Sequence, residues 1–175
     1  RGSSARVFSG RLQGIPEQPG AAIKIMRPDE VEYAAPLFRE EAQILTLMRD
    51  VPGVMRMYEL GFLRLDEGHA LPPEDRQHSG AGLRGKIQRY GVEELQNFLI
   101  SMDVRIGQGW LPYLAFERYS QQHNLMVYCD AGHTHGRFLP LRESLFLAIQ
   151  ICDILQVAHD RNIIYRDHKI LHYYW

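Results

Sequence analysis

A strand-like apolar run near the start of this chain carries a single lysine in its middle. The run extends from Ala21 to Met26, and it follows a second strand pattern, Val7 to Leu12, after a turn from Gly14 to Gly20 that contains Pro16 and Pro19. Two strand patterns joined by a short turn rich in Gly and Pro predict an antiparallel hairpin. Any fold assigned to this chain therefore has to open with a β-hairpin.

A helical pattern follows the break at Pro28 and Asp29. Charged residues separate apolar residues that recur every three to four positions, namely Phe38, Ala42 and Leu45. Pro52 and Gly53 end the predicted helix, and the apolar residues of Val54 to Leu65 then alternate loosely enough for one or two strand segments.

The middle of the chain has a weaker pattern. The range 68–85 is rich in Gly, Pro, His and charge without periodicity, which predicts a loop or a partly disordered insertion. Helical spacing returns from Val92 to Met102, and Trp110 to Tyr119 has the apolar composition of another strand. A turn is expected from Gly132 to Gly136.

The clearest helix extends from Leu141 to His159. Its residues are apolar nearly all round, which predicts a buried helix. The longest apolar stretch of the chain, Leu145 to Ala158, lies within it, and Gln150 and Asp153 make this stretch too polar, as well as too short, to cross a membrane. We therefore expect no membrane segment.

Composition narrows the class of partner. The 175 residues (20.3 kDa) predict one domain, or one domain with part of another missing, and 20 Lys and Arg against 21 Asp and Glu argue against general nucleic-acid binding. The two cysteines, Cys129 and Cys152, suit a reducing compartment, so we expect a cytoplasmic protein.

The ends of the chain, Arg1 and an aromatic run finishing at Trp175, suggest a fragment cut at both sides.

Three groups of residues are candidates for chemistry. Gly2 to Val7 places small residues before a strand, where backbone N–H groups can approach a phosphate, and a tight hairpin turn is the alternative. Lys24 lies among apolar neighbours, so its ammonium needs an acidic partner or an anionic ligand, unless it reaches solvent from an edge strand. Glu41 on the predicted helix is the obvious partner, and a carboxylate on a solvated face is its alternative.

The third group is the charged cluster within Ile163 to His172. It follows the predicted buried helix and two isoleucines, and it sets the carboxylate of Asp167 beside the cations of Arg166 and Lys169. A salt-bridged turn explains the same residues without any chemistry.

The order of these pieces resembles the signature set of protein kinases. A Gly/Ser loop is followed by Ala-Ile-Lys in a strand, Phe-Arg-Glu-Glu-Ala in a helix, Pro-Gly-Val, a strand ending in Phe-Glu-Arg-Tyr, and then Ala-His-Asp-Arg-Asn-Ile-Ile-Tyr-Arg-Asp-His-Lys. The resemblance looks closest to bacterial serine/threonine kinases. It covers the chain except for an insertion at about 66–108.

This resemblance implies a nucleotide site in the small lobe. Gly2 would be the second glycine of the glycine-rich loop, followed by Ser3 and Ser4, and Ala5 stands where the third glycine would be. Val7 would cover the adenine. In the next strand Ala22 would line the site, and Lys24 would hold the α/β-phosphates while paired with Glu41. At the hinge Phe116 would be the gatekeeper residue. The main chain of Glu117 and Tyr119 would contact the edge of the adenine.

The resemblance also implies a catalytic loop. Asp167 would accept or orient the proton of a substrate hydroxyl, and Lys169 would neutralise the γ-phosphate in the transition state. Tyr165 replaces the loop histidine, and a phenol can still pack and hydrogen-bond there. The resemblance implies ATP with Mg²⁺, or with Mn²⁺ in its place, as the cofactor. His172 replaces the asparagine that ligates a magnesium, and an imidazole suits Mg²⁺ poorly, so this position either takes Mn²⁺ or binds no second metal.

We therefore expect an α+β, protein-kinase-like fold: an antiparallel small lobe and hinge over 1–119, and the truncated start of a helical large lobe over 120–175, with nucleotide between them. The implied function is transfer of phosphate from ATP to a serine or threonine of a protein substrate, with the fragment itself inactive. The alternatives are a pseudokinase that binds nucleotide or acts as a scaffold, and a small-molecule kinase.

Overall fold

The structure, a computed structural model, describes residues 5–10, 20–71, 84–134, 139–166 and 169–174. The chain divides into two compact units. The first contains residues 1–49 and 55–118, and the second contains residues 50–54 and 119–175. The boundary between residues 118 and 119 lies at the end of the strand predicted from Trp110 to Tyr119. The short segment 50–54 belongs to the second unit, although residues of the first unit precede and follow it in sequence.

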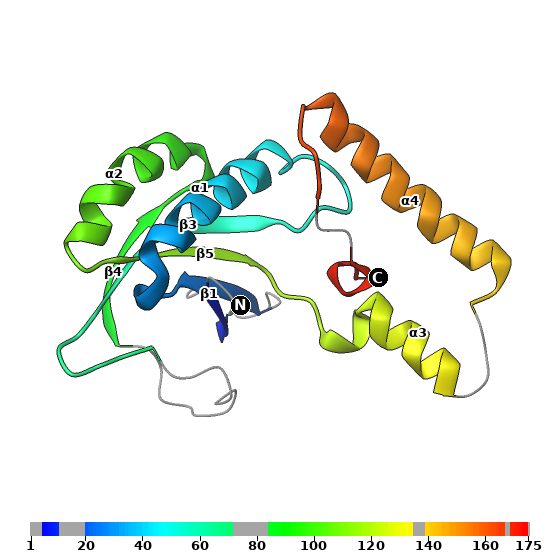
Figure 1. The fold of residues 1–175 in the computed structure, drawn as a ribbon, viewed down its shortest axis with the longest axis horizontal. Helices are drawn as coiled ribbons and strands as arrows, with labels where there is room; N and C mark the ends of the chain where they lie inside the picture. Colours follow the sequence, from blue (N-terminus) through cyan, green and yellow to red (C-terminus); the bar gives the residue numbers. More distant parts are fainter. Residues whose placement is uncertain (1–4, 11–19, 72–83, 135–138, 167–168, 175) are drawn as a thin grey trace. The chain divides into compact units, whose positions relative to one another are not determined.

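The first unit is built on a five-stranded antiparallel sheet of order β1-β2-β5-β3-β4 (Figure 1). The strands are β1 (Ala5–Gly10), β2 (Ala21–Met26), β3 (Met57–Leu65), β4 (Gly85–Tyr90) and β5 (Leu111–Glu117). The predicted hairpin is confirmed, with β2 at its predicted bounds; β1 begins two residues earlier than expected, and residues 11–19 lie outside the described part. An α+β fold is therefore present.

Two helices cover one face of this sheet. They are α1 (Val31–Leu47) and α2 (Leu95–Gly107). Because side chains alternate along a strand, one set of strand residues faces the helices and the other set faces away. The cluster under the helices includes Phe38 and Ala42 of α1, Phe98 and Met102 of α2, and Phe62 of β3. The opposite face has its own cluster, formed by Ile25, Leu63, Leu71, Leu111, Tyr113 and Ala115.

The range 66–108, which the resemblance leaves out as an insertion, contains two elements of the first unit. Gly85–Tyr90 forms strand β4 of the sheet, which the sequence pattern did not predict, and the helix predicted near Val92–Met102 is α2, whose inner face lies in the main core. Strand β4 escapes prediction because it is an edge strand with exposed side chains, and such strands lack the apolar alternation that reveals a half-buried one. Residues 72–83 lie outside the described part.

The second unit is helical. It contains α3 (Leu125–Thr134), α4 (Leu141–Asp160) and the short 3₁₀ segments η3 (Gln121–His123) and η4 (Ile170–His172). The turn expected from Gly132 is wrong at its start, because Gly132 to Thr134 continue α3; residues 135–138 lie outside the described part. No helix among the described residues is long and apolar enough to cross a membrane.

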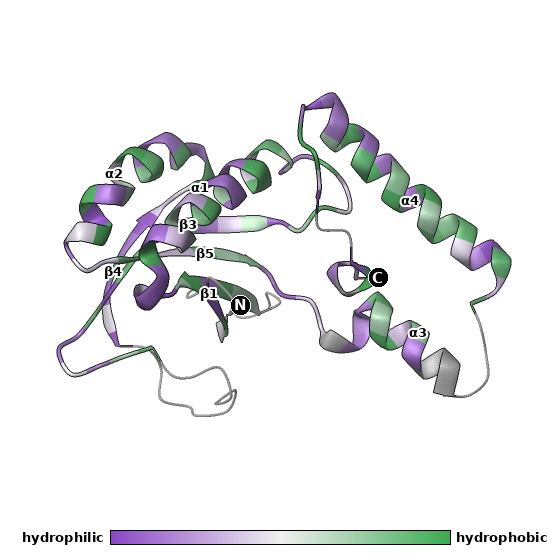
Figure 2. Cartoon of the chain, in the orientation of Figure 1, coloured by the Kyte–Doolittle hydropathy of each residue, from purple (hydrophilic) through white to green (hydrophobic). Residues whose placement is uncertain are grey.

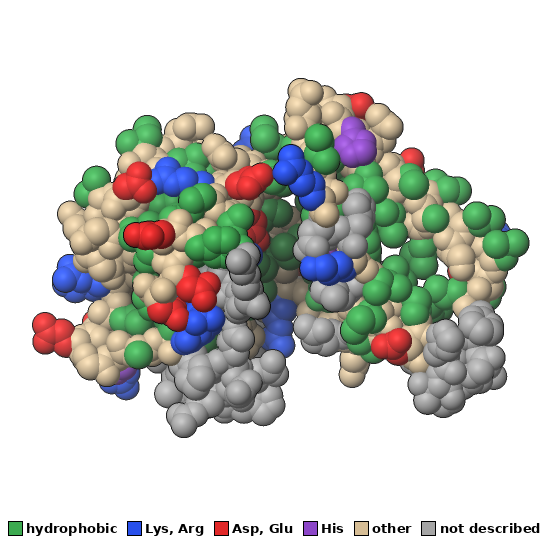
Figure 3. All heavy atoms as spheres, in the orientation of Figure 1, with side chains coloured by type: hydrophobic (Ala, Val, Ile, Leu, Met, Phe, Trp, Pro, Cys, Tyr) green, Lys and Arg blue, Asp and Glu red, His purple; other side chains and the backbone are tan. Residues whose placement is uncertain are grey.

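Helix α4 has nearly the predicted bounds, but its predicted burial is wrong. Only Ala158 is buried, whereas Leu141, Phe146 and Ile149 are 75%, 62% and 58% exposed. Figure 2 shows hydrophobic residues along the helix, and Figure 3 shows hydrophobic side chains on its surface. Apolar periodicity reports which residues favour burial, whereas burial itself requires a neighbouring element to cover them.

Candidate functional site

An ion pair joins the sheet to α1 at the lysine that the sequence singles out. Nζ of Lys24 lies 2.5 Å from Oε2 of Glu41, and the two side chains are 22% and 31% exposed. Lys24 stands in the middle of β2, between Val7 of β1 and Leu114 of β5. Its expected pairing with Glu41 is present, and Lys24 does not lie on an edge strand, because β2 is flanked on both sides.

Next to this ion pair the same face of the sheet carries a small apolar surface. Directly opposed residues of antiparallel strands share a face, so Val7 and Lys24 lie together, as do Ala22 and Phe116. Ala5, at one end of this face, is buried in the main core cluster, but Val7 is 61% exposed and Ala22 is half-buried. An apolar surface with a cation at its border suits a ligand that has a flat ring and an anionic chain.

The glycine-rich loop expected from the sequence is only partly described. Gly2, Ser3 and Ser4 lie outside the described residues. Ala5 is the first residue of β1, pairs with Met26 and has a side chain that is 1% exposed in the core. Any contact of Ala5 with a nucleotide would therefore have to come from its backbone.

The predicted hinge lies where the first unit ends. Phe116 is 6% exposed in the main core, and the N–H of Glu117 donates to the carbonyl of Arg56 at 2.8 Å. Tyr119 begins the second unit, where its ring lies 5.5 Å from the ring of Tyr174, centroid to centroid. The main chain at Glu117 is therefore held in place by the segment that leads into β3 rather than left in an open loop.

A hydrogen bond closes the loop that the resemblance identifies as catalytic. The hydroxyl of Tyr165 lies 2.8 Å from Nδ1 of His172, so the two ends of the loop are joined. Asp167 and His168 lie outside the described residues, and Lys169 is exposed and stands at the start of η4. The segment after the loop is fixed to α3, because the N–H of Leu125 donates to the carbonyl of Tyr173 at 2.9 Å.

The donors that the described residues offer do not fit a magnesium ion. Within the described ranges, no three His, Cys, Asp or Glu side chains are grouped as metal ligands. His172 would offer an imidazole where Mg²⁺ favours oxygen, and its Nδ1 already bonds to Tyr165.

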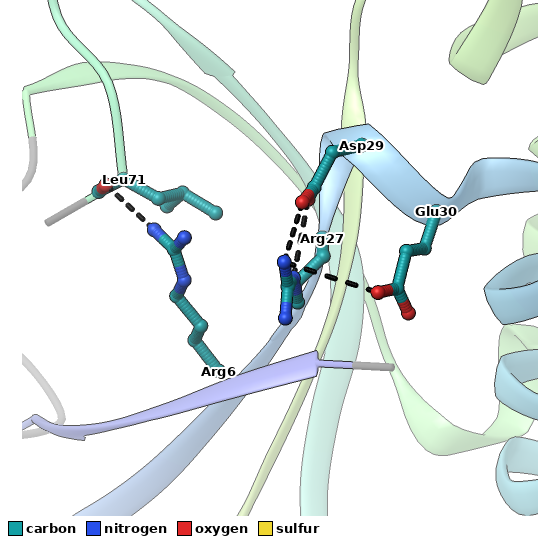
Figure 4. A network of polar contacts seen from close by, with 5 residues as sticks. All are labelled: Arg6, Arg27, Asp29, Glu30 and Leu71. Carbon is teal, nitrogen blue, oxygen red and sulfur yellow. Dashed lines mark hydrogen bonds and ion pairs between the residues drawn. The ribbon is translucent and has the colours of Figure 1, made fainter. Parts of the chain in front are cut away.

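Charged residues also fix the start of α1 (Figure 4). The guanidinium of Arg27, just after β2, donates to the carboxylate of Asp29 and lies 3.9 Å from Glu30, the residue before α1. A separate hydrogen bond, from Arg6 of β1 to the carbonyl of Leu71 at 2.7 Å, ties β1 to the segment after β3. The hydrogen bond from Arg27 holds the pKa of Asp29 below its ordinary value. The helix that carries Glu41 is thus anchored at the end of β2.

Two of the other ion pairs join residues far apart in sequence, and sequence reasoning missed both. Arg39 of α1 contacts Asp103 of α2 at 2.5 Å, and Arg161 contacts Asp50 through two hydrogen bonds of 2.6 and 2.9 Å within the second unit. The partners stand 64 and 111 residues apart in sequence, so no local pattern could have indicated either contact.

Comparisons with protein-family models, curated proteins and solved structures gave no match to this chain.

Proposed function

We propose that this chain is the nucleotide-binding portion of an ATP-dependent phosphotransferase of the serine/threonine protein kinase type. The observation that carries the proposal is the ion pair between Lys24 and Glu41 beside an apolar surface formed by the exposed Val7 and the half-buried Ala22. Lysine held in place by a carboxylate offers a fixed cation for phosphates, and the apolar surface offers a platform for adenine. A cytoplasmic location and a protein substrate are part of the same proposal.

In this proposal the chemical step belongs to the loop in the second unit. The carboxylate of Asp167 accepts the proton of a serine or threonine hydroxyl, whose oxygen attacks the γ-phosphorus while ADP leaves. The ammonium of Lys169 stabilises the charge that develops on the phosphate oxygens. Support for these two roles comes from the sequence resemblance.

A second candidate function is nucleotide binding without transfer. It is favoured by the hydrogen bond between Tyr165 and His172, because the residue at the expected metal-binding position bonds to a side chain of its own loop. A protein of this kind would act through the conformation that nucleotide stabilises.

Nucleotide binding is the first test. Titration calorimetry of the chain with ATP in Mg²⁺ and in Mn²⁺ should show binding, and Lys24→Met should weaken it by at least about tenfold, because a charge-assisted phosphate contact is lost. Lys86→Met is the matched control, since Lys86 is an exposed lysine of β4 in the same sheet. No binding by the wild-type chain, or equal losses in both variants, contradicts the proposal.

Phosphate transfer separates the two candidates. The full-length protein that contains this chain is incubated with γ-labelled ATP and casein as a generic acceptor, beside its Asp167→Asn variant. Removing a general base costs about 10²- to 10⁴-fold, so label that depends on Asp167 establishes the phosphotransferase. ATP binding with no transfer that depends on Asp167 favours the non-catalytic alternative.

A further inference from the structure

Helix α2 packs directly on the helix that carries Glu41. Helices α1 and α2 contact each other on the same side of the sheet (Figure 1). Their apolar side chains share one buried cluster, in which Phe38 and Ala42 come from α1 and Phe98 and Met102 come from α2. The position of α1 over the sheet is therefore limited by α2 as well as by the strands.

A single arginine of α1 reaches two points on α2. Nη1 of Arg39 donates to the backbone carbonyl of Leu99 at 3.1 Å, and Nη2 contacts Oδ1 of Asp103 at 2.5 Å. The side chain of Arg39 is 31% exposed, whereas that of Asp103 is 83% exposed. The bond to the carbonyl is therefore the better shielded of the two, and the contact with Asp103 is largely screened by water.

Arg39 and Glu41 face different neighbours. Residues two apart on an α-helix point about 200° from one another, so they lie on nearly opposite sides of α1. Glu41 contacts Lys24 of the sheet, and Arg39 contacts α2. Helix α1 is consequently held from two sides near the same turn, with Ala42 fully buried beside them.

Helix α2 is itself fixed to the sheet. The ring of Phe98 stacks on Phe62 of β3 at 4.8 Å between centroids and meets Tyr90 of β4 edge-on at 6.1 Å. Before the helix, the N–H of Gly91 donates to Glu94 at 2.8 Å. Because rigid aromatic packing fixes its first turns, α2 provides a firm support for α1.

We infer that β4 and α2 form a built-in brace that keeps α1 in the position where Glu41 reaches Lys24, and that Arg39 is the positioning residue through which the brace acts. Both elements lie within the range 66–108 that the kinase resemblance leaves unexplained. The consequence for nucleotide affinity rests on the proposed function, whereas the effect on the Lys24–Glu41 ion pair is independent of it.

Nucleotide affinity tests the brace through Glu41. Arg39→Ala should weaken ATP binding by about fivefold and Asp103→Ala by less than about twofold, since the exposed ion pair contributes little. In the Glu41→Gln background, Arg39→Ala should change the affinity by less than about twofold, because two residues that act through one contact are not additive. Arg64→Ala, an exposed arginine of β3, is the matched control and should leave affinity unchanged.

Two results overturn the inference. One is an Arg39→Ala variant that melts earlier but binds ATP as the wild type does. The other is an additive loss in the double variant with Glu41→Gln, which would make Arg39 a general structural residue.

A second measurement keeps the inference testable without nucleotide. The coupling between Lys24 and Glu41 is obtained from urea unfolding of Lys24→Met, Glu41→Gln and the double variant, once in the wild-type background and once in the Arg39→Ala background. The coupling, expressed as a factor in the unfolding equilibrium constant, should fall by about threefold or more when Arg39 is absent. An unchanged coupling overturns the brace, whereas a wild-type chain that does not bind ATP overturns only the proposed function.

Discussion

Tyr165 and His172 are bonded to each other, hydroxyl to Nδ1, across a loop of eight residues, at 2.8 Å. Their rings also meet edge-on, 6.3 Å apart between centroids. These are the two positions at which the loop departs from the kinase pattern, so the departures are joined in one contact. A tyrosine hydroxyl and an imidazole provide a hydrogen bond whether the imidazole is neutral or protonated, because the hydroxyl can donate or accept.

Breaking this contact should loosen the loop without unfolding the chain. Tyr165→Phe and His172→Phe should each lower the free energy of unfolding by about 0.5 to 1 kcal/mol, and the double variant should lose little more, since both substitutions remove the same hydrogen bond. Urea unfolding of the four proteins measures the coupling. Strictly additive losses would show that the two side chains do not depend on each other.

Lys24 should be required for nucleotide binding but not for stability. Methionine at this position suits the apolar neighbours in β2 and leaves the carboxylate of Glu41, which is 31% exposed, in contact with water, so Lys24→Met should lower the melting temperature only slightly. Glu41→Ala, in contrast, leaves the ammonium without its carboxylate and should destabilise the chain by about 1 kcal/mol. Thermal melts of the two variants decide the point, and a large loss in Lys24→Met would mean that the ion pair is mainly structural.

Local sequence patterns predicted the helices and strands whose ends are marked by Gly or Pro or whose periodicity is uninterrupted. Strand β2 is bounded by Gly20 and Pro28, and α4 is an uninterrupted helical pattern of the expected length. The pairing of Lys24 with Glu41 followed from the order of motifs. These predictions needed only short-range information, or a pattern shared with a family.

The rest depends on tertiary contacts. Strand β4 exists because it pairs with β3, from Leu60 opposite Tyr90 to Leu65 opposite Gly85, and its own residues are mostly exposed. The bond from Arg39 to α2 joins residues that only the fold brings together. Of the candidate site, the structure describes the ion pair and the sheet face, whereas the roles of Gly2 and Asp167 stay predictions.

Gly53 is predicted to be irreplaceable for two reasons. Its φ is +85°, and a Cβ at this position would lie 2.8 Å from Cδ1 of Ile154. Gly68 is the matched control, because its φ is +77° but a Cβ there would meet nothing within 4 Å. Gly68→Ala should cost about 1 kcal/mol from backbone strain alone, and Gly53→Ala should cost clearly more in urea unfolding. Equal losses would show that Ile154 moves aside freely.

Stability should fall in alkaline solution because of Tyr113. Burial, followed by the nearby carboxylate of Glu59 to which its hydroxyl donates at 2.9 Å, raises the pKa of Tyr113 well above its ordinary value of 10. The folded chain therefore keeps a proton that the unfolded chain loses, so the contribution is fully present below about pH 10 and is lost as pH rises above it. Urea unfolding from about pH 9 to pH 11 should show a steeper decline for the wild type than for Tyr113→Phe. Equal slopes would contradict the assignment.

The exposed apolar side of α4 should make the chain associate in solution. Leu141, Leu145 and Ile149 recur every four residues and are 75%, 54% and 58% exposed, so they form a stripe along one side of the helix. Such a continuous apolar stripe favours association, because contact with another surface removes it from water.

Leu145→Lys should shift sedimentation velocity profiles toward the monomer, while changing the unfolding free energy by less than about 0.5 kcal/mol, because the side chain is exposed. Gln150→Lys, which adds the same charge on an exposed polar position of the helix, should leave association unchanged. A wild-type chain that sediments as a single monomer at about 100 µM, a concentration at which weak contacts are populated, would show that the stripe is tolerated in water.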